Sequence, residues 1–266
     1  MSGESRIAAA FEDSGKRAAL MPYMMGGFPD LAESRAIGEA YADSGADLIE
    51  LGVPYSDPLA DGPVIHAAGS AALAAGISLD GVFELAEALS KRVPVVVMCY
   101  ANLIYARGIE RFCEELAQAG GSGVIVPDIP LEEAPALRAS CQQAGLALVP
   151  LIAPTTPEPR LEAIGSHAAG FLYTVSVAGI TGERSSVDAS VAALVKRARA
   201  HTEVPVAVGF GIASPDHAVA VADAGADGII VGTRFVREAA EAVEHGKSPA
   251  DAVRSLASEF SSALKR

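Results

Sequence analysis

Residues 40–50 read AYADSGADLIE, and this stretch shows the pattern from which the fold can be predicted. An alanine-rich segment of helical character ends near Gly45, and an apolar run of strand character follows from Leu48. Glycine ends helices because it readily adopts the left-handed conformation that follows the last helical turn. The same order recurs in ELAQAGGSGVIV, SCQQAGLALVP and AVADAGADGIIV, at residues 115–126, 140–150 and 220–231. The pattern predicts a chain built from alternating helices and strands.

Eight runs of strand character recur along the chain, mostly spaced to hold one strand, one helix and two loops. Several, such as VPVVVM and VPVAVG, are apolar on both faces, as strands of a parallel sheet covered on both sides should be. The predicted strands span Leu20–Met25, Leu48–Gly52, Val93–Met98, Gly123–Pro127, Ala147–Ile152, Gly170–Val175, Pro205–Gly209 and Gly228–Gly232.

Eight such units without a linker or a composition shift predict an α/β protein with a single TIM-barrel domain over residues 1–266. Residues 1–16 are predicted to form an extra helix before the first strand, and Pro249–Arg266 a closing helix. A doubly wound open sheet is the alternative topology.

Composition narrows the class of function. The 266 residues are half hydrophobic and carry a formal net charge of −13, which argues against nucleic acid or an anionic membrane as a partner. The N-terminus lacks the apolar core of a secretory signal, and no apolar run is long enough for a membrane span. The three cysteines are too few and too scattered for a disulfide framework or a zinc motif. We therefore expect a cytoplasmic protein with reduced thiols and no metal site.

Glu50 is the first candidate catalytic residue. It lies near the C-terminal end of the second predicted strand, and active sites of TIM barrels lie at that end of the strands. Alternation along the strand places Glu50 and Gly52 on the inner face, where partial desolvation would raise the pKa of a carboxyl toward a range useful for proton transfer. The alternative is a structural glutamate paired with an arginine, although no arginine occurs within the other predicted strands.

The loop after this strand adds two further carboxylates, Asp57 and Asp61. Each has a structural alternative: Asp57 precedes Pro58 and suits an Asx-turn, and Asp61 precedes Gly62 in a position suited to a helix N-cap.

Glycine-rich turns follow the last two predicted strands, at residues 209–211 and 232–234. Phosphate sites of TIM barrels are frequently built by these two loops, because glycine lets the backbone approach the phosphate oxygens. The loop after the sixth strand, which contains Gly179 and Gly182, is long enough to act as a lid. Ordinary strand-to-helix turns are the alternative reading of these glycines.

The positions of the lysines and histidines, and the absence of a dinucleotide motif, argue against several kinds of catalysis. All five lysines fall outside the predicted strand ends, so a Schiff-base aldolase has no candidate nucleophile. The five histidines are dispersed, which argues against a metal-dependent aldolase, and no GxGxxG dinucleotide motif follows the first strand. Acid–base chemistry by carboxylates on a phosphorylated substrate remains.

The chain resembles the tryptophan synthase α subunit family. The matching motifs are PYMMGGFPD, ELGVPYSDPLADGPVI, MCYANLIYARG, VIVPDIPLEE, LIAPTTP, YTVSVAGITGER, VGFGI and IIVGTR, in family order across nearly the full chain. The resemblance implies a lyase of L-tryptophan biosynthesis that cleaves indole-3-glycerol phosphate to indole and glyceraldehyde 3-phosphate. It also implies no cofactor in this chain and an α2β2 complex with a β subunit that carries pyridoxal phosphate and receives the indole through a tunnel.

The resemblance also implies roles for individual residues. Glu50 would be the general acid–base group, Asp61 would face the indole N–H, and Tyr173 would be an active-site tyrosine. Asp57 would lie in the loop that meets the β subunit. The implied indole-pocket residues are Tyr23, Met98, Tyr100, Ile125, Ile152, Thr181 and Phe210, and the implied phosphate cradle comprises Gly182, Gly211, Gly232 and Thr233.

Two positions depart from the family pattern. Tyr23 stands where phenylalanine is common, so its hydroxyl would narrow the pocket or reach water. Arg234 follows Thr233 where a small residue is usual, and either adds charge for phosphate or points to solvent. Two other functions remain open at this point: another phosphosugar lyase or isomerase, and a weakly catalytic subunit that mainly activates a partner.

Overall fold

The computed structural model describes residues 1–175, 189–209 and 211–265. Within these ranges all strands belong to one parallel sheet, in the order β5-β4-β3-β2-β1-β9-β8-β7-β6. The strands are β1 Ala19–Met25, β2 Ile49–Gly52, β3 Val95–Met98, β4 Gly123–Ile125, β5 Ala147–Val149, β6 Leu151–Ile152, β7 Leu172–Val175, β8 Val206–Gly209 and β9 Gly228–Val231. The first strand pairs with the last one, as a barrel requires.

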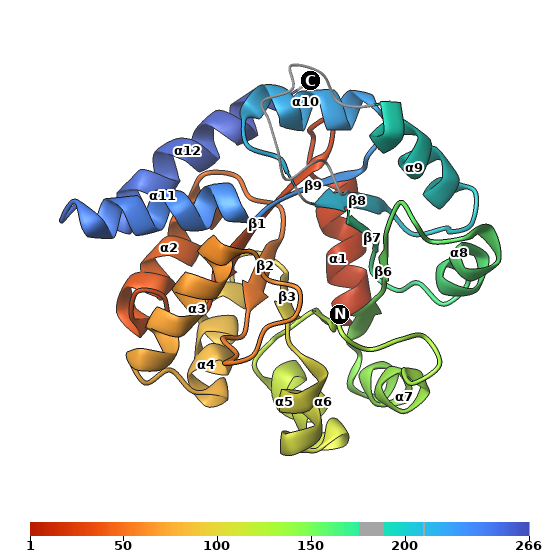
Figure 1. The fold of residues 1–266 in the computed structure, drawn as a ribbon, viewed down its shortest axis with the longest axis horizontal. Helices are drawn as coiled ribbons and strands as arrows, with labels where there is room; N and C mark the ends of the chain where they lie inside the picture. Colours follow the sequence, from red (N-terminus) through yellow and green to blue (C-terminus); the bar gives the residue numbers. More distant parts are fainter. Residues whose placement is uncertain (176–188, 210, 266) are drawn as a thin grey trace.

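Helices surround this sheet, as Figure 1 shows. They are α1 Gly3–Glu12, α2 Leu31–Asp43, α3 Pro63–Ala74, α4 Leu79–Ser90, α5 Ala101–Arg107, α6 Ile109–Gln118, α7 Pro135–Ala144, α8 Glu158–Gly165, α9 Ala189–Arg199, α10 Pro215–Asp223, α11 Thr233–Glu244 and α12 Pro249–Ala263. The prediction of a TIM barrel with alternating strands and helices is confirmed. None of the helices in the described ranges combines the length and apolar character that crossing a bilayer requires.

The four glycines that end helices in the repeated pattern behave as predicted. Gly45, Gly120, Gly145 and Gly225 all have positive φ angles, between 73° and 101°. A side chain would be strained in this conformation, so glycine lets each helix end and the chain turn toward the next strand.

The fifth predicted strand is divided in two at Pro150. Its first half, β5, pairs with β4, and its second half, β6, pairs with β7. Proline has no N–H to donate to a neighbouring strand, but its carbonyl still accepts a hydrogen bond of 3.0 Å from the backbone N–H of Tyr173. The barrel therefore continues across this residue.

Two apolar layers give the strands their orientation. One cluster fills the barrel and includes Met21, Leu48 and Val96, whereas Ile49 and Leu51 belong to the larger cluster that packs against the surrounding helices. Side chains along β2 thus alternate between the interior and the helices, as predicted. Glu50 shares the inner face with Leu48.

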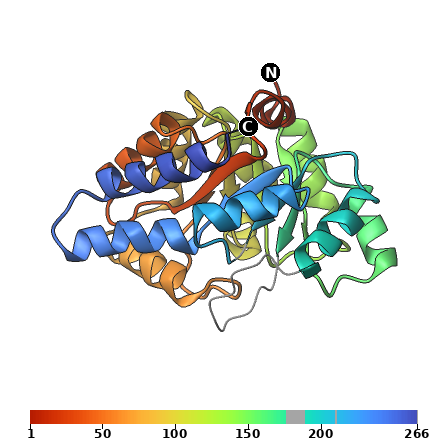
Figure 2. The ribbon, with the colours of Figure 1, turned by 90° about the horizontal axis from the view of Figure 1, so that it is seen from above.

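The extra N-terminal helix is confirmed as α1, which lies across one end of the barrel in Figure 2. Ile7 is fully buried within the interior cluster. The Arg6 guanidinium donates to the carbonyls of Gly120 and Ser90, which lie just before the strands at this end. The helix thereby covers the end of the barrel opposite the predicted catalytic residues.

Candidate active site

Glu50 lies deep in the upper barrel interior, at the C-terminal half of β2. Its side chain is 1% exposed, and parallel pairing sets it beside Tyr23 of β1. Its Oε2 atom is buried without a hydrogen-bond partner among the described residues, and no cation of those residues forms an ion pair with it. Burial, and next the negative charge of Asp61, raise the pKa of Glu50 to about 8. A carboxyl group with this pKa can both give and take a proton near neutral pH.

Two buried tyrosines flank this carboxyl group. Desolvation raises the pKa of Tyr23 and of Tyr173 well above the ordinary value, and in both cases the charge of Glu50 adds to the shift. Glycines make room for both rings. A Cβ atom on Gly52 would lie 2.1 Å from the Tyr23 hydroxyl oxygen, and one on Gly209 would lie 2.4 Å from that of Tyr173. The structure therefore brings the predicted Tyr23, Glu50 and Tyr173 together.

Asp61 is held in the loop after β2 by Tyr100. The Tyr100 hydroxyl donates a hydrogen bond of 2.9 Å to Asp61 Oδ1 and accepts one of 3.0 Å from the backbone N–H of Ala60. Partial burial raises the pKa of Asp61, while the Tyr100 hydrogen bond and the charge of His66 oppose the shift. Asp61 does not serve as a helix cap, because the N-cap of α3 is Gly62 and no side chain caps that helix.

The same loop continues outward to Asp57, which is exposed and accepts a 2.5 Å hydrogen bond from the Ser56 hydroxyl. Leu59, two residues further along the loop, is 85% exposed, which is unusual for a large apolar side chain. The two predicted acids of this loop therefore face different ways, Asp61 toward the barrel and Asp57 toward the surface.

Apolar side chains form walls around Glu50. Ile125 belongs to the interior cluster and Met98 packs against it, as expected for pocket residues. Ile152 is buried in the larger cluster, to which Tyr23 also belongs, and its neighbour Leu151 packs against the interior cluster. Sequence reasoning missed Leu151. The strand alternation after Pro150 was the signal that could have found it.

The candidate phosphate end comprises Gly211, Gly232 and Thr233. Gly232 is the N-cap of α11 and has no side-chain cap, so the first N–H groups of that helix are open to an anion. Gly211 has a φ of 77°, which favours glycine. Arg234 forms an ion pair with Glu238 one turn later in α11. Its positive charge is therefore balanced by that carboxylate instead of being directed at a phosphate. The predicted Thr181, Gly182 and Phe210 lie outside the described residues.

Tyr55 and Asp128 also contact residues of the site, and neither was predicted as a site residue from the sequence. The ring of Tyr55 lies against that of Tyr100, with centroids 5.2 Å apart. Asp128, which follows β4, accepts a 2.9 Å hydrogen bond from the backbone N–H of Ala101. A carboxylate just after a predicted strand was the available signal for Asp128.

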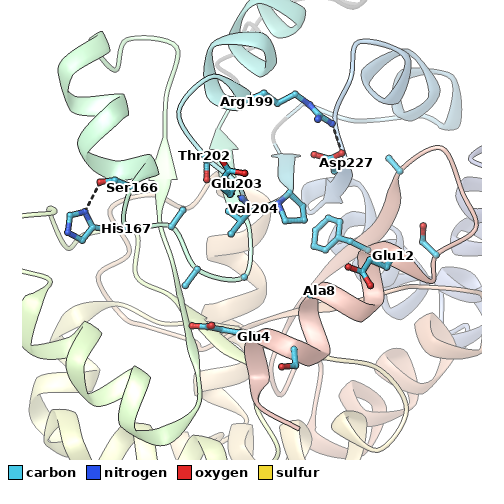
Figure 3. A pocket seen from close by; sticks show the side chains of 18 of the residues that line it. Glu4, Ala8, Glu12, Ser166, His167, Arg199, Thr202, Glu203, Val204 and Asp227 are labelled. Atoms are coloured by element: carbon cyan, nitrogen blue, oxygen red, sulfur yellow. Dashed lines mark hydrogen bonds and ion pairs between the residues drawn. The ribbon is translucent and has the colours of Figure 1, made fainter.

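A large cleft lies at the opposite end of the barrel, between α1 and the loops that lead into the strands (Figure 3). Its lining mixes acidic and basic side chains, including Glu12 and Glu203, and Arg199 reaches across to Asp227. None of the predicted site residues lines this cleft. The described residues also contain no group of three or more histidine, cysteine or acidic side chains placed to hold a metal ion.

Comparison with known proteins agrees with this geometry. The family model described as "Tryptophan synthase alpha chain" matches residues 10–265. The tryptophan synthase alpha chain of a Synechococcus species is 48% identical over 242 residues, which cover 90% of each chain. That of Methanosarcina acetivorans is 43% identical over 264 residues, covering 98% of this chain and 95% of the relative.

Solved structures agree as well. The tryptophan synthase subunit alpha of Legionella pneumophila superposes with a TM-score of 0.90 at 35% identity, covering 99% of this chain and 98% of that one. A tryptophan synthase structure from Mycobacterium tuberculosis gives a TM-score of 0.89 at 35% identity, covering 98% of each chain. The chain belongs to the tryptophan synthase alpha chain family.

Proposed function

We propose that Glu50 and Asp61 carry out the reaction of this family, the cleavage of indole-3-glycerol phosphate to indole and glyceraldehyde 3-phosphate. The observation that carries the assignment is the buried carboxyl group of Glu50, raised in pKa to about 8 at the catalytic end of the barrel. A group of this kind is poised for general acid–base catalysis.

The cleavage needs two proton transfers. Protonation of indole C3 turns this carbon into a competent leaving group, and Glu50 in its acid form supplies that proton. Loss of the proton from the glycerol hydroxyl then breaks the carbon–carbon bond, and the carboxylate left on Glu50 accepts it. One glutamate therefore performs both steps and regains its starting state, with no cofactor in this chain.

Asp61 stabilises the charge that the first transfer creates. Protonation at C3 makes the indole ring an indoleninium cation, and a carboxylate close to the ring N–H is aimed at that positive charge. Its hydrogen bond to Tyr100 holds it before the substrate arrives. The apolar walls near Met98 and Ile125 suit an indole ring, and the open N-terminus of α11 suits the phosphate.

We propose a β subunit that carries pyridoxal phosphate as the partner, in an α2β2 assembly that receives the indole. The exposed loop with Asp57 and Leu59 supports a docking surface beside the active site. The three cysteines of the chain are free and buried, which suits the reducing cytoplasm in which we place this enzyme of L-tryptophan biosynthesis.

The decisive experiment measures indole release from indole-3-glycerol phosphate by the wild-type chain and by Glu50→Gln. Glutamine keeps the size of the side chain and removes its proton chemistry, so we expect a loss in kcat of about 10²–10⁴-fold with an unchanged circular dichroism spectrum. Glu84→Gln, at an exposed position of α4, is the matched control and should retain full activity.

The assay is run with and without the β subunit. No indole release in either condition would refute the proposed reaction. Full activity of a folded Glu50→Gln variant would refute the role of this residue. A wild-type chain that only activates the β subunit would instead be a regulatory partner.

A further inference from the structure

Asp128 joins two neighbouring βα units at the catalytic end of the barrel. It follows β4, and its Oδ1 accepts a hydrogen bond of 2.9 Å from the backbone N–H of Ala101, which is 27 residues earlier in the chain. Ala101 is the first residue of α5. The N-cap residue of that helix is Tyr100, and its side chain makes no capping hydrogen bond. Asp128 therefore supplies from another loop the acceptor that this helix start lacks.

Tyr100, which directly precedes Ala101, is the residue that holds Asp61. The Tyr100 side chain is 4% exposed, and its hydroxyl bonds both the Asp61 carboxylate and the backbone N–H of Ala60. Tyr100 can hold both groups only while its own backbone stays in place. A continuous series of contacts thus runs from Asp128 through the start of α5 to Tyr100 and Asp61.

Electrostatics places the Asp128 charge near the same backbone. The pKa of the Cys99 thiol is raised mainly by burial and secondly by the negative charge of Asp128. The pKa of Tyr100 is raised to about 12, chiefly by burial, with smaller contributions from the charges of Asp61 and Asp128. A phenol with this pKa stays protonated and keeps donating to Asp61 across the neutral range.

We propose that Asp128 is a positioning residue for the cleavage reaction, which fixes the first turn of α5 and, through Tyr100, sets the orientation of Asp61. The proposal rests on the function proposed above for Asp61. Asp128 itself does not touch the reacting atoms. Because Asp61 acts on charge that develops in the transition state, loss of its orientation should lower kcat more than it raises KM.

The test is a double-mutant cycle on the full chain, with kcat and KM measured for indole release. Asp128→Ala and Tyr100→Phe are made singly and together, because a residue that acts through Tyr100 should have little further effect once the tyrosine hydroxyl is gone. Asp128→Asn retains an oxygen that can accept the Ala101 N–H and is the conservative variant.

Asp30→Ala is the matched control. Asp30 Oδ1 accepts a hydrogen bond of the same length, 2.9 Å, from the backbone N–H of Glu33 at the start of α2. This substitution therefore removes a comparable helix cap that has no contact with Tyr100 or Asp61. We expect its kcat to stay within about twofold of wild type.

We expect Asp128→Ala to lower kcat about tenfold, as loss of one hydrogen bond to a charged group would, and to change KM less than about threefold. Added to Tyr100→Phe, it should lower kcat by less than about twofold. Asp128→Asn should stay within about threefold of wild type.

Additive losses in the cycle, a comparable loss in Asp30→Ala, or a loss that arises only when the β subunit is present would each overturn the proposal. Asp128→Ser replaces the alanine variant if the latter does not fold. Failure of both to fold would make Asp128 a folding residue and also overturn the proposal. An inactive wild-type chain would instead refute the proposed function, so the two failures are distinguishable.

Discussion

At the residue scale, the main feature is Glu50, a carboxyl group placed where burial disfavours its charged form. Glu50 is almost completely buried and has no described cation beside it, so its acid form persists to a higher pH than that of an ordinary glutamate. This is a cost to stability that benefits proton transfer. Asp61, which is only partly buried and bonded to Tyr100, is better suited to remain charged.

The pKa of Glu50 predicts how stability changes with pH. The value is about 8 in the folded protein, against 4.5 for an ordinary glutamate. Between these values the folded state retains a proton that the unfolded state has released, so the free energy of unfolding falls as pH rises. The penalty is absent below the lower value and complete above the higher one.

Removing this carboxyl group should therefore stabilise the protein increasingly as pH rises above the ordinary glutamate pKa of 4.5. We expect Glu50→Gln to raise the free energy of unfolding by on the order of 1–4 kcal/mol near pH 9, and by little near pH 4. Urea unfolding of both proteins across this range measures the difference. Glu84→Gln should follow wild type throughout. A difference that does not change with pH would contradict the assignment.

At the element scale, the ends of the strands determine which side chains reach the pocket. Parallel pairing of β1 with β2 sets Tyr23 beside Glu50, and pairing of β7 with β8 brings Tyr173 toward the end of β8. The rings fit because the strands β2 and β8 end in glycine, at Gly52 and Gly209. Small residues at strand ends are thus part of the shape of the pocket.

Gly209→Ala tests this fit. The new Cβ atom would lie 2.4 Å from the Tyr173 hydroxyl oxygen and 2.8 Å from the ring, so the ring must move. We expect a loss of about 1–3 kcal/mol in stability, typical of overpacking, together with about a tenfold loss in kcat/KM for indole release.

Gly69→Ala is its control, because a Cβ atom there would meet only the flexible end of Met25, at 3.3 Å. This change within α3 should be neutral or raise stability by about 0.5–1 kcal/mol, through the better helix propensity of alanine. Unchanged activity and stability in Gly209→Ala would show that Tyr173 does not depend on the glycine.

At the scale of the whole molecule, the segment that leads from α1 into β1 meets the C-terminal residues of the chain. The backbone N–H of Arg17 donates a hydrogen bond to the carbonyl of Leu264. The backbones of Lys16 and Lys265 pair there as an isolated antiparallel β-bridge. Near this junction the Lys16 ammonium bonds both oxygens of Asp47, at 2.7 and 2.8 Å, with both side chains largely buried. Asp47 also accepts a hydrogen bond from the backbone N–H of Leu20, the second residue of β1.

Lys16→Met should be strongly destabilising. It leaves the buried Asp47 carboxylate without its cation, and loss of one partner of a buried ion pair costs about 3–5 kcal/mol. The loss should shrink at acidic pH, where Asp47 becomes neutral; its pKa is already raised by burial, against the opposing effect of Lys16. Thermal unfolding at several pH values measures this.

Lys91→Met removes one partner of an exposed pair with Glu87 and should cost less than about 1 kcal/mol. Equal losses in the two lysine variants would show that burial of the first pair has no special effect.

The sequence alone was enough to predict the order of strands and helices and to place candidate catalytic residues at the C-terminal ends of the strands. Helical and strand periods are local properties of the chain, so runs such as residues 93–98 and glycines such as Gly45 could be interpreted without a structure. Alternation within one strand was enough to predict that Glu50 points into the barrel. The reaction itself came from family motifs that cover nearly the full chain.

Contacts between groups far apart in the chain could be known only from the three-dimensional structure. The pairing of β5 with β4 and of β6 with β7, and the hydrogen bond between Asp128 and Ala101, depend on how separate βα units pack together. A local period carries no information about such contacts, because they join residues tens of positions apart. For the same reason only the direction of the pKa shift of Glu50 could be predicted from the sequence. The size of that shift depends on how completely the closed barrel removes water from the carboxyl group.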